Sequence, residues 1–399
     1  MKKSFLFLSM IGVLALTSCG GDKETLEEQI EYYPVQVGEK ENWGFLGSNG
    51  EVLFADNFKE EPTAVINGYF SVKEGETYSL YEISEKPNKP VLSDMNSIGV
   101  VMDGVVPAAP KKDRIKLYNT DGEELFELEP QGGKEITGSN PYVSDGLLVA
   151  WTSENKYGAF NKDGEVVIEF KYDNLGDFRD GLAVAEKTND GKTTYMIINK
   201  DNEEVAKFSG DKFSMKSERF YKGYLTFKDD ERVGFIDKDG EKYVMPTSVK
   251  QLGDYNSDYI IMKDDNGWGI MTFDVEEPEV VLKGKYDSMS FVPGESDKFL
   301  VKDNNGKYFV IDTEGEKVVS FSEDFKNVTP VYAKGFRYVA TDNNKQVLLN
   351  EDGERIDKKV DYQSLTTNAS ASSVKSGKEN SGNGGGNNDG GDFGGGFGE

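Results

Sequence analysis

Histidine is absent from this chain of 399 residues, and cysteine occurs once, as Cys19. A single cysteine excludes a disulfide within the chain. Without histidine, the commonest general base and the usual His/Cys zinc sites are missing. The 72 acidic residues leave a paired-carboxylate glycosidase formally open, but no pair is singled out by its context. We therefore expect no enzyme activity, no metal site and no cofactor.

Positive charge is also scarce. The chain has 46 Lys and Arg against 72 Asp and Glu, for a net charge of −26. Such an acidic surface repels phosphate backbones and anionic lipid headgroups. Nucleic acid is therefore not an expected partner.

The longest apolar run, residues 5–16, is too short to span a bilayer as a helix. It follows Lys2 and Lys3 and leads into Leu16-Thr17-Ser18-Cys19, which is the arrangement of a signal peptide. The segment resembles the lipobox of bacterial lipoproteins, in which the cysteine is acylated and becomes the first residue. The resemblance implies a signal peptide at residues 1–18, lipid attachment at Cys19 and an acylated linker at residues 19–31.

The linker begins with an acidic stretch, Gly20-Gly21-Asp22-Lys23-Glu24. It is similar to the signals that send lipoproteins of the Bacteroidetes to the cell surface. We expect a protein of the cell envelope, anchored in the outer membrane, with the choice between surface and periplasm left open.

A repeated motif of an aromatic or apolar residue followed by glycine dominates the rest of the chain. Its clearest copies are Trp43-Gly44, Tyr157-Gly158, Val233-Gly234 and Trp268-Gly269, with weaker copies at Tyr78, Ile115, Tyr195, Tyr308 and Val347. The spacing between successive copies averages about 38 residues. A fixed period of this length is typical of propellers and solenoids.

Each repeat has the same internal order, clearest between residues 172 and 208. A first strand leads into Gly181-Leu182-Ala183-Val184-Ala185, a polar turn leads to the motif strand, and a Gly-containing turn leads to a last strand. Glycine just past a strand indicates a hairpin that needs positive φ. The pattern predicts an antiparallel β-meander, and hence an all-β protein.

The repeats resemble WG repeats, a family with the order Tyr-Asp, Phe, Gly-Leu-Ala-Val, Trp-Gly-Phe-Ile-Asp and Gly. The resemblance covers residues 32–365 and is weakest for the copies at Tyr78 and Ile115, where serine and lysine replace the glycine. Within it, the motif aromatics and their glycines are expected to serve packing between units, the glycine permitting close approach of a neighbouring strand or ring.

Meanders of this size must stack on each other, either in a closed β-propeller or in an open β-solenoid. The chain opens at residues 32–37 with what matches a second strand and closes at residues 360–365 with what matches a first strand. Such out-of-phase ends favour a propeller that closes through a shared blade. Counting motifs gives nine blades, or eight if one of the weak copies is an insertion.

Two further segments carry expectations. Residues 366–399 are rich in Ser, Gly and Asn and are expected to be disordered. Asp237-Lys238-Asp239-Gly240-Glu241 and Asp264-Asp265-Asn266-Gly267 resemble parts of calcium loops, but their twelfth positions are Ser248 and Val275, which cannot supply the bidentate acid. We interpret both as turns.

The leading hypothesis is a membrane-anchored, non-catalytic scaffold that binds a protein partner. The alternative is a carbohydrate-binding surface lipoprotein of a glycan-uptake system, with loop aromatics as platforms. Trp151, which no other repeat shares and which is expected to be partly exposed near a hairpin end, is the candidate ligand contact.

Overall fold

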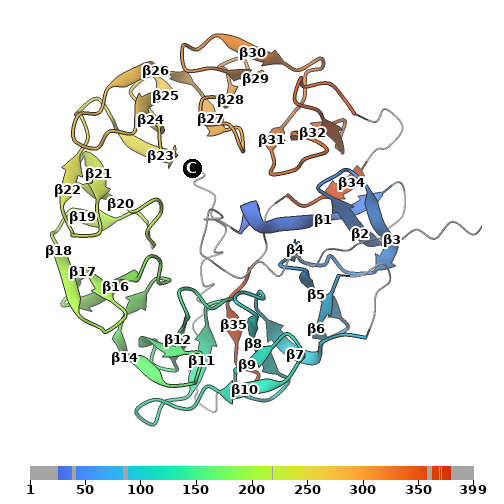
Figure 1. The fold of residues 1–399 in the computed structure, drawn as a ribbon. Helices are drawn as coiled ribbons and strands as arrows, with labels where there is room; N and C mark the ends of the chain where they lie inside the picture. Colours follow the sequence, from blue (N-terminus) through green and yellow to red (C-terminus); the bar gives the residue numbers. More distant parts are fainter. Residues whose placement is uncertain are drawn as a thin grey trace, which may run out of the picture.

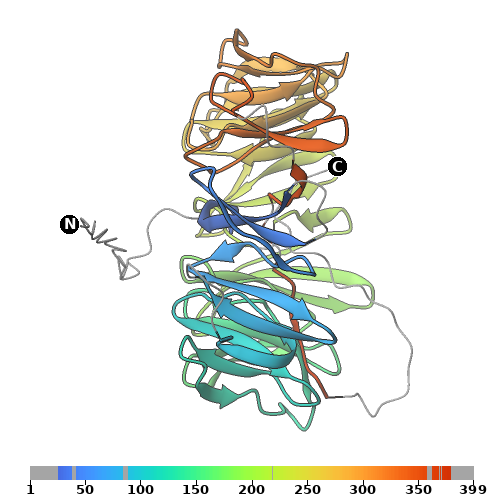
Figure 2. The ribbon, with the colours of Figure 1, turned by 90° about the vertical axis from the view of Figure 1, so that its right-hand side faces the viewer.

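The computed structural model describes residues 26–37, 42–83, 89–217, 219–356, 362–367, 369 and 371–378. Their antiparallel strands form nine blades arranged in a closed ring (Figure 1). Seen from its edge, the ring is a disc (Figure 2). The expected signal peptide and Cys19 lie outside the described residues. Among the residues described, no helix has the length and apolarity needed to cross a membrane.

Blades are numbered in chain order, and blade 1 contains the first repeat motif, Trp43-Gly44. Blades 4 to 8 each contain a four-stranded meander, whose strands are given in order from the centre of the ring outward. Blade 4 has β11 (Ile136–Ser139), β12 (Leu147–Thr152), β13 (Tyr157–Asn161) and β14 (Val166–Tyr172). Blade 5 has β15 (Asn174–Leu175), β16 (Leu182–Asn189), β17 (Lys192–Asn199) and β18 (Glu204–Ser209). Blade 6 has β19 (Phe213–Met215), β20 (Leu225–Asp229), β21 (Arg232–Ile236) and β22 (Lys242–Val244). Blade 7 has β23 (Gln251–Tyr255), β24 (Tyr259–Asp264), β25 (Gly267–Thr272) and β26 (Val280–Tyr286). Blade 8 has β27 (Ser288–Phe291), β28 (Phe299–Lys302), β29 (Tyr308–Ile311) and β30 (Lys317–Ser320).

The remaining four blades are joined into one continuous sheet of 14 strands, because some strands pair with two blades. Blade 9 has β31 (Val328–Pro330), β32 (Tyr338–Asp342) and β33 (Lys345–Leu349). Blade 1 has β34 (Tyr362–Leu365), β1 (Ile30–Val37), β2 (Trp43–Gly47) and β3 (Val52–Phe58), preceded by a 3₁₀ turn, η1 (Glu27–Gln29). Blade 2 has β4 (Val65–Ile66), β5 (Tyr69–Glu74), β6 (Thr77–Glu82) and β7 (Leu92–Ile98). Blade 3 has β8 (Val105–Pro110), β9 (Lys116–Asn119) and β10 (Glu124–Glu127), and β7 pairs with β8 as well as β6.

The two ends of the repeat region pair with each other. Val35 of β1 lies opposite Leu365 of β34, and Val37 lies opposite Tyr362. The prediction of ring closure through a shared first blade is confirmed. Every motif strand, including the weak copies at Tyr78 and Ile115, belongs to a blade of its own, so the count of nine is confirmed as well.

A two-residue turn between the first and second strands recurs because both of its residues tolerate positive φ. In blades 3, 4 and 5 the pairs are Asp103-Gly104, Asp145-Gly146 and Asp180-Gly181, with φ of 51° to 54° at aspartate and 75° to 83° at glycine. This is the signature of a type I′ turn, which matches the twist of a hairpin. In these three blades, the Asp-Gly pair therefore reverses the chain at the same position, between the first and second strands.

The glycine of the repeat motif has a different role. A Cβ at Gly158 would lie 2.6 Å from the carbonyl oxygen of Ile168, in the fourth strand of the same blade. A Cβ at Gly269 would overlap the carbonyl of Leu282 in the equivalent way. In both blades the register of the third and fourth strands shifts beside this glycine. The glycine therefore permits close approach of a neighbouring strand, as expected. That neighbouring strand is the fourth strand of the same blade as the glycine.

The hydrophobic core is divided between neighbouring blades rather than centred in the molecule. One cluster, for example, joins Ile261 and Ile270 of blade 7 to Phe299 and Val301 of blade 8, all nearly inaccessible to solvent. Since each blade buries its faces only against its neighbours, the stacking of repeats supplies the core.

The expectation of disorder at the C-terminus is wrong for Val374–Lys375. Residues 366–399 were expected to be disordered, but Val374–Lys375 form a further strand, β35, which pairs with β11 of blade 4. Val374 is fully buried in the core between blades 3 and 4. After β34 the chain passes through the centre of the ring to reach this position (Figure 1). Residues 379–399 lie outside the described residues.

Candidate functional site at the centre of the ring

The motif residues expected to serve packing are buried or half-buried. Trp43 belongs to a cluster with Phe45, Phe58 and Phe70, and Val233 belongs to the core between blades 6 and 7. Trp268 packs at the edge of the core between blades 7 and 8.

Gly44, Gly158, Gly234 and Gly269 all lie in third strands and are buried. These positions therefore form structure within and between blades.

Trp151 is buried, not partly exposed as the sequence suggested. It lies in β12 with only 9% of its surface accessible, and its ring stacks on Tyr157 with the centroids 5.3 Å apart. Gly138 of the neighbouring strand packs against it, and Lys375 of the C-terminal segment places its Nζ 4.9 Å from the ring centroid. The C-terminal segment, expected to be disordered, thus supplies one of the side chains that surround Trp151.

A row of side chains facing the centre of the ring comes from one repeat position, four residues before the glycine of the first turn. The position holds Ala64, Val100, Tyr142, Asp177 and Arg219 in blades 2 to 6. The side chains thus change from apolar to polar around the ring. No sequence motif drew attention to them, although alignment of the repeats on the turn glycine would have placed them together.

The polar members of this row form a hydrogen-bonded network across three blades. The phenol of Tyr142 donates to Asp177 Oδ2 at 2.9 Å, and Asn140 Nδ2 donates to Asp177 Oδ1 at 2.5 Å. Arg219 Nη1 donates to the Tyr142 hydroxyl oxygen at 2.8 Å. Asn140, Tyr142 and Asp177 are buried.

The members of the network are hydrogen-bonded to one another. Burial, and then the negative charge of Asp177, raises the pKa of Tyr142, so its phenol keeps its proton. Each oxygen of Asp177 accepts one hydrogen bond from this network. The network links blades 4, 5 and 6 at their inner edges.

The row continues into blade 7 with Asp254, whose side chain is accessible to water yet surrounded by protein atoms. Desolvation by the surrounding protein raises the pKa of its carboxyl group. Tyr332 of blade 9 donates to Glu28 Oε1 at 3.0 Å, and its pKa is raised by desolvation and by the charge of Glu28. Acidic and phenolic groups from three parts of the chain therefore meet near the ring centre.

The apolar side of the row is covered by residues that flank the repeat region on both sides. Leu26 before β1 and Ala369 and Ala371 after β34 belong to one cluster with Ala64 and Tyr142. The centre of the ring is therefore partly filled by the chain itself, on the side where its lining is apolar.

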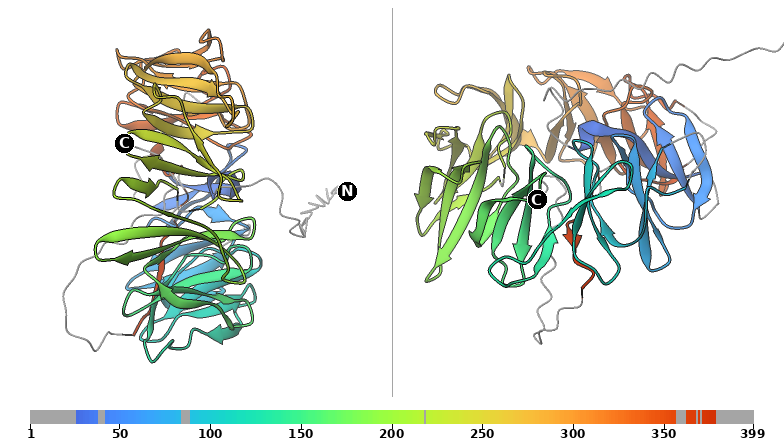
Figure 3. Two further views of the ribbon diagram at one scale, coloured as in Figure 1. Left: turned by 90° about the vertical axis from the view of Figure 1, so that its left-hand side faces the viewer. Right: turned by 60° about the horizontal axis from the view of Figure 1, so that its bottom comes forward.

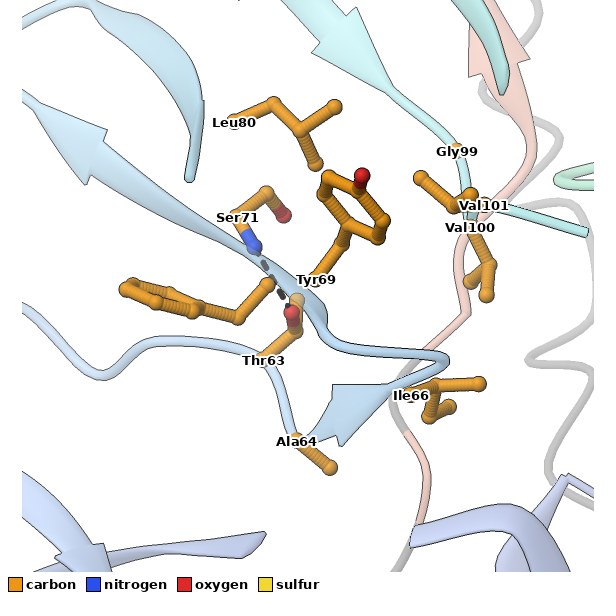
Figure 4. Close-up of a pocket in the computed structure, with 10 residues that line it drawn as sticks. Thr63, Ala64, Ile66, Tyr69, Ser71, Leu80, Gly99, Val100 and Val101 are labelled. Atoms are coloured by element: carbon orange, nitrogen blue, oxygen red, sulfur yellow. Dashed lines mark hydrogen bonds between the residues drawn. The ribbon is translucent and has the colours of Figure 1, made fainter. Parts of the chain in front are cut away.

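Two hollows accompany these features. The first lies between blades 2 and 3, beside Tyr69, Gly99 and Val100, and its volume of about 10 Å³ leaves room for about one water molecule (Figure 4). The second is an open hollow of about 340 Å³ beside Tyr308, Phe309 and Phe321, between the outer strands of blade 8 and the start of blade 9.

The two acidic loops compared with calcium sites are turns. Asp237 Oδ1 accepts the backbone N–H of Asp239 and of Glu241, and Asp264 Oδ1 accepts that of Asn266. No group of three or more metal-ligating acids, histidines or cysteines occurs in the part of the chain that is described.

Ion pairs between blades were also missed from the sequence. Lys162, Lys200 and Lys238 each reach the turn aspartate of the preceding blade, Asp103, Asp145 and Asp180 respectively. Exposed pairs of this kind contribute little individually. Their regular recurrence could have been found by comparing the repeats with each other.

Comparison with known proteins supports the repeat assignment over part of the chain. Residues 157–191 match the model of the WG containing repeat family. No curated protein is detectably similar in sequence.

Among solved structures, the chain is similar to the eukaryotic initiation factor, at a TM-score of 0.56 and 10% identity, over 84% of this chain and 97% of the other. It is also similar to the C-terminal WD40 domain of Sif2, at a TM-score of 0.40 and 12% identity, over 75% of this chain and 92% of the other. Only the first TM-score exceeds 0.5, so only that structure supports the fold. At sequence identities this low, neither structure indicates the function of this chain.

Proposed function

We propose that this protein is a membrane-anchored, non-catalytic scaffold of the cell envelope that binds a protein partner. The observation that supports the proposal most is that the polar side chains at the centre of the ring are hydrogen-bonded to one another. Asp177 and Tyr142 are committed to each other and to Asn140 and Arg219, as structural groups are, while the ring exposes loops from nine blades. Propellers commonly use such loops and faces for binding.

The anchor depends on Cys19, in the segment that resembles a lipobox. The variant Cys19→Ser is expected to be either unprocessed or soluble, because no thiol remains for acylation. Membrane fractionation with a size measurement tests this. A Cys19→Ser protein that is cleaved to the mature size and still sediments with membranes would contradict the anchor.

Exposure at the cell surface is tested separately. Protease added to intact cells should degrade the propeller if it faces outward. Full protection would place the body in the periplasm.

A partner is sought by cross-linking in intact cells, followed by purification of the detergent-solubilised protein. A specific protein recovered with the wild-type chain and lost when the ring is denatured supports the proposal. Saturable binding on a glycan array, with no protein partner, would favour the carbohydrate alternative.

A further inference from the structure

The C-terminal segment 371–378 lies between blades 3 and 4 as an added strand. β35 pairs with β11 through Gly138 opposite Lys375 and Ser139 opposite Val374. β35 is the red strand in the lower part of Figure 3 (right). Within the described residues, β35 is a fifth strand for blade 4, whereas blades 5 to 8 form sheets of four.

Both neighbouring blades hold the segment by its backbone. On the blade 3 side, Ser97 lies in β7, which pairs with strands of both blade 2 and blade 3. Its Oγ donates to the carbonyl of Lys375 at 2.8 Å and accepts the N–H of Lys375 at 2.9 Å. On the blade 4 side, the N–H of Ser376 donates to the carbonyl of Thr137 at 3.1 Å. The N–H of Gly377 donates to the carbonyl of Asp113, in blade 3, at 2.9 Å. Contacts of this kind recognise an extended chain more than its sequence.

Three side-chain positions of the segment are nevertheless selective. Val374 is fully buried in the apolar cluster between blades 3 and 4, together with Ala109 and Ala150. Lys375 lies over the ring of Trp151, a favourable cation–π arrangement. Gly377 passes so close to Pro110 that a Cβ there would overlap its carbonyl oxygen.

The ring does not need this segment to close. Closure is made upstream, where β34 pairs with β1 and the N–H of Thr366 donates to the carbonyl of Pro34 at 3.0 Å. The added strand could therefore leave its slot while the nine blades remain joined.

We propose that the junction of blades 3 and 4 is a strand-addition site for an extended peptide with the pattern Val-Lys-Ser-Gly, occupied in the structure by the chain's own residues 374–377. A partner protein enters by presenting such a segment and displacing the internal one. The proposal rests on the proposed function as a protein-binding scaffold and names the site and the chemistry of the partner.

The test uses the full chain with Val374→Asp, which expels the internal strand because an unpaired carboxylate cannot occupy the apolar slot. The probe is a labelled peptide with the sequence of residues 371–378, and binding is followed by fluorescence anisotropy. The matched control protein carries Val318→Asp, the same change at a position 45% exposed on β30. A control peptide carries aspartate in place of the valine.

The expected result is saturable binding to Val374→Asp that is at least about tenfold tighter than to the wild type or Val318→Asp, where the tethered segment competes at high local concentration. The control peptide should not bind. Equal binding of both peptides, or no binding to Val374→Asp, would overturn the proposal.

Hydrogen exchange on the unaltered protein provides an independent readout if Val374→Asp does not fold. The amides of Lys375, Ser376 and Gly377 should exchange faster than that of Thr366, because the slot opens without opening the ring. Exchange of all four only at the rate of global unfolding would show a permanent strand and contradict the proposal.

The outcome also separates this proposal from the proposed function. If the peptide binds the slot but cells yield no protein partner, the function fails and the site stands. If a partner is recovered equally with and without excess peptide, the scaffold function stands and this slot is not its site.

Discussion

Val35 and Leu365 lie directly opposite each other on β1 and β34, at the two ends of the repeat region, and both side chains are buried. Thr366 follows Leu365 and Pro34 precedes Val35, and the N–H of Thr366 donates to the carbonyl of Pro34. Val35 and Leu365 are therefore an antiparallel pair without hydrogen bonds between them. In such a pair the side chains approach closely. This contact converts a row of nine blades into a ring.

Two truncations separate closure from the added strand. Removal of residues 370–399 should lower the free energy of unfolding by about 1.5–3 kcal/mol, for the burial of one valine, Val374. Removal of residues 358–399 also deletes Tyr362 and Leu365 and exposes a sheet edge, so it should cost about 3–6 kcal/mol more. Chemical denaturation measures both. A difference below about 1 kcal/mol, as expected for a minor surface change, would argue against the closed ring.

The motif glycine should be intolerant of even one methyl group. Gly269→Ala places a Cβ against the carbonyl of Leu282 and 2.8 Å from the backbone N of Gly284, and backbone atoms cannot move aside cheaply. We expect a loss of about 2–4 kcal/mol, in the range of strained or overpacked sites. Gly210→Ala is the matched control, since its nearest neighbour would be Phe213 Cβ at 3.3 Å. Equal melting temperatures for the two variants would refute this role of the glycine.

The buried network should be costly to break. Asp177→Ala leaves the Asn140 amide and the Tyr142 phenol buried without their acceptor, at about 1–3 kcal/mol for each group. Asp163→Ala, the same change on an exposed turn, should stay within about 0.5 kcal/mol of the wild type. Denaturation of both variants checks this. A loss for Asp177→Ala no greater than that for Asp163→Ala would show that the network contributes nothing.

Asp254 predicts a pH dependence with a definite sign. Desolvation raises its pKa in the folded protein above the ordinary value of 3.8, so folding favours its protonated form. Its contribution to stability is therefore lost as the pH rises from the ordinary value through the raised one. Asp254→Asn removes this penalty and should melt at a higher temperature than the wild type at pH 7, with the advantage vanishing below pH 3.8. An advantage that is absent at pH 7, or present only in acid, would contradict this sign.

The repeat architecture could be predicted because its signals are local and recur. Asp145-Gly146 and its equivalents mark turns, and the glycine of Trp268-Gly269 and its equivalents marks a close approach between strands. Ring closure followed from the phase of the two ends, although the register places Leu365, not Tyr362, opposite Val35.

The candidate contact residue was harder to predict because its surroundings come from distant parts of the chain. Trp151 has no equivalent in other repeats, which suggested exposure, but Lys375 covers it. A Ser/Gly-rich segment carries few apolar residues, and its composition does not show that one valine, Val374, finds a fitted slot. The central network depends likewise on side chains from three different blades.

The closed ring is tested most directly by a disulfide between cysteines placed at Val35 and Leu365, in a chain that also carries Cys19→Ser. Directly opposed residues of a pair without hydrogen bonds have Cα atoms about 4.5 Å apart, within the range of about 4.4–6.8 Å that a disulfide spans. We predict that this variant oxidises quantitatively in its folded state, giving a species of altered mobility on a non-reducing gel, and that it unfolds at a higher temperature when oxidised. A folded variant whose two thiols both remain free under the same oxidation would contradict the closed ring.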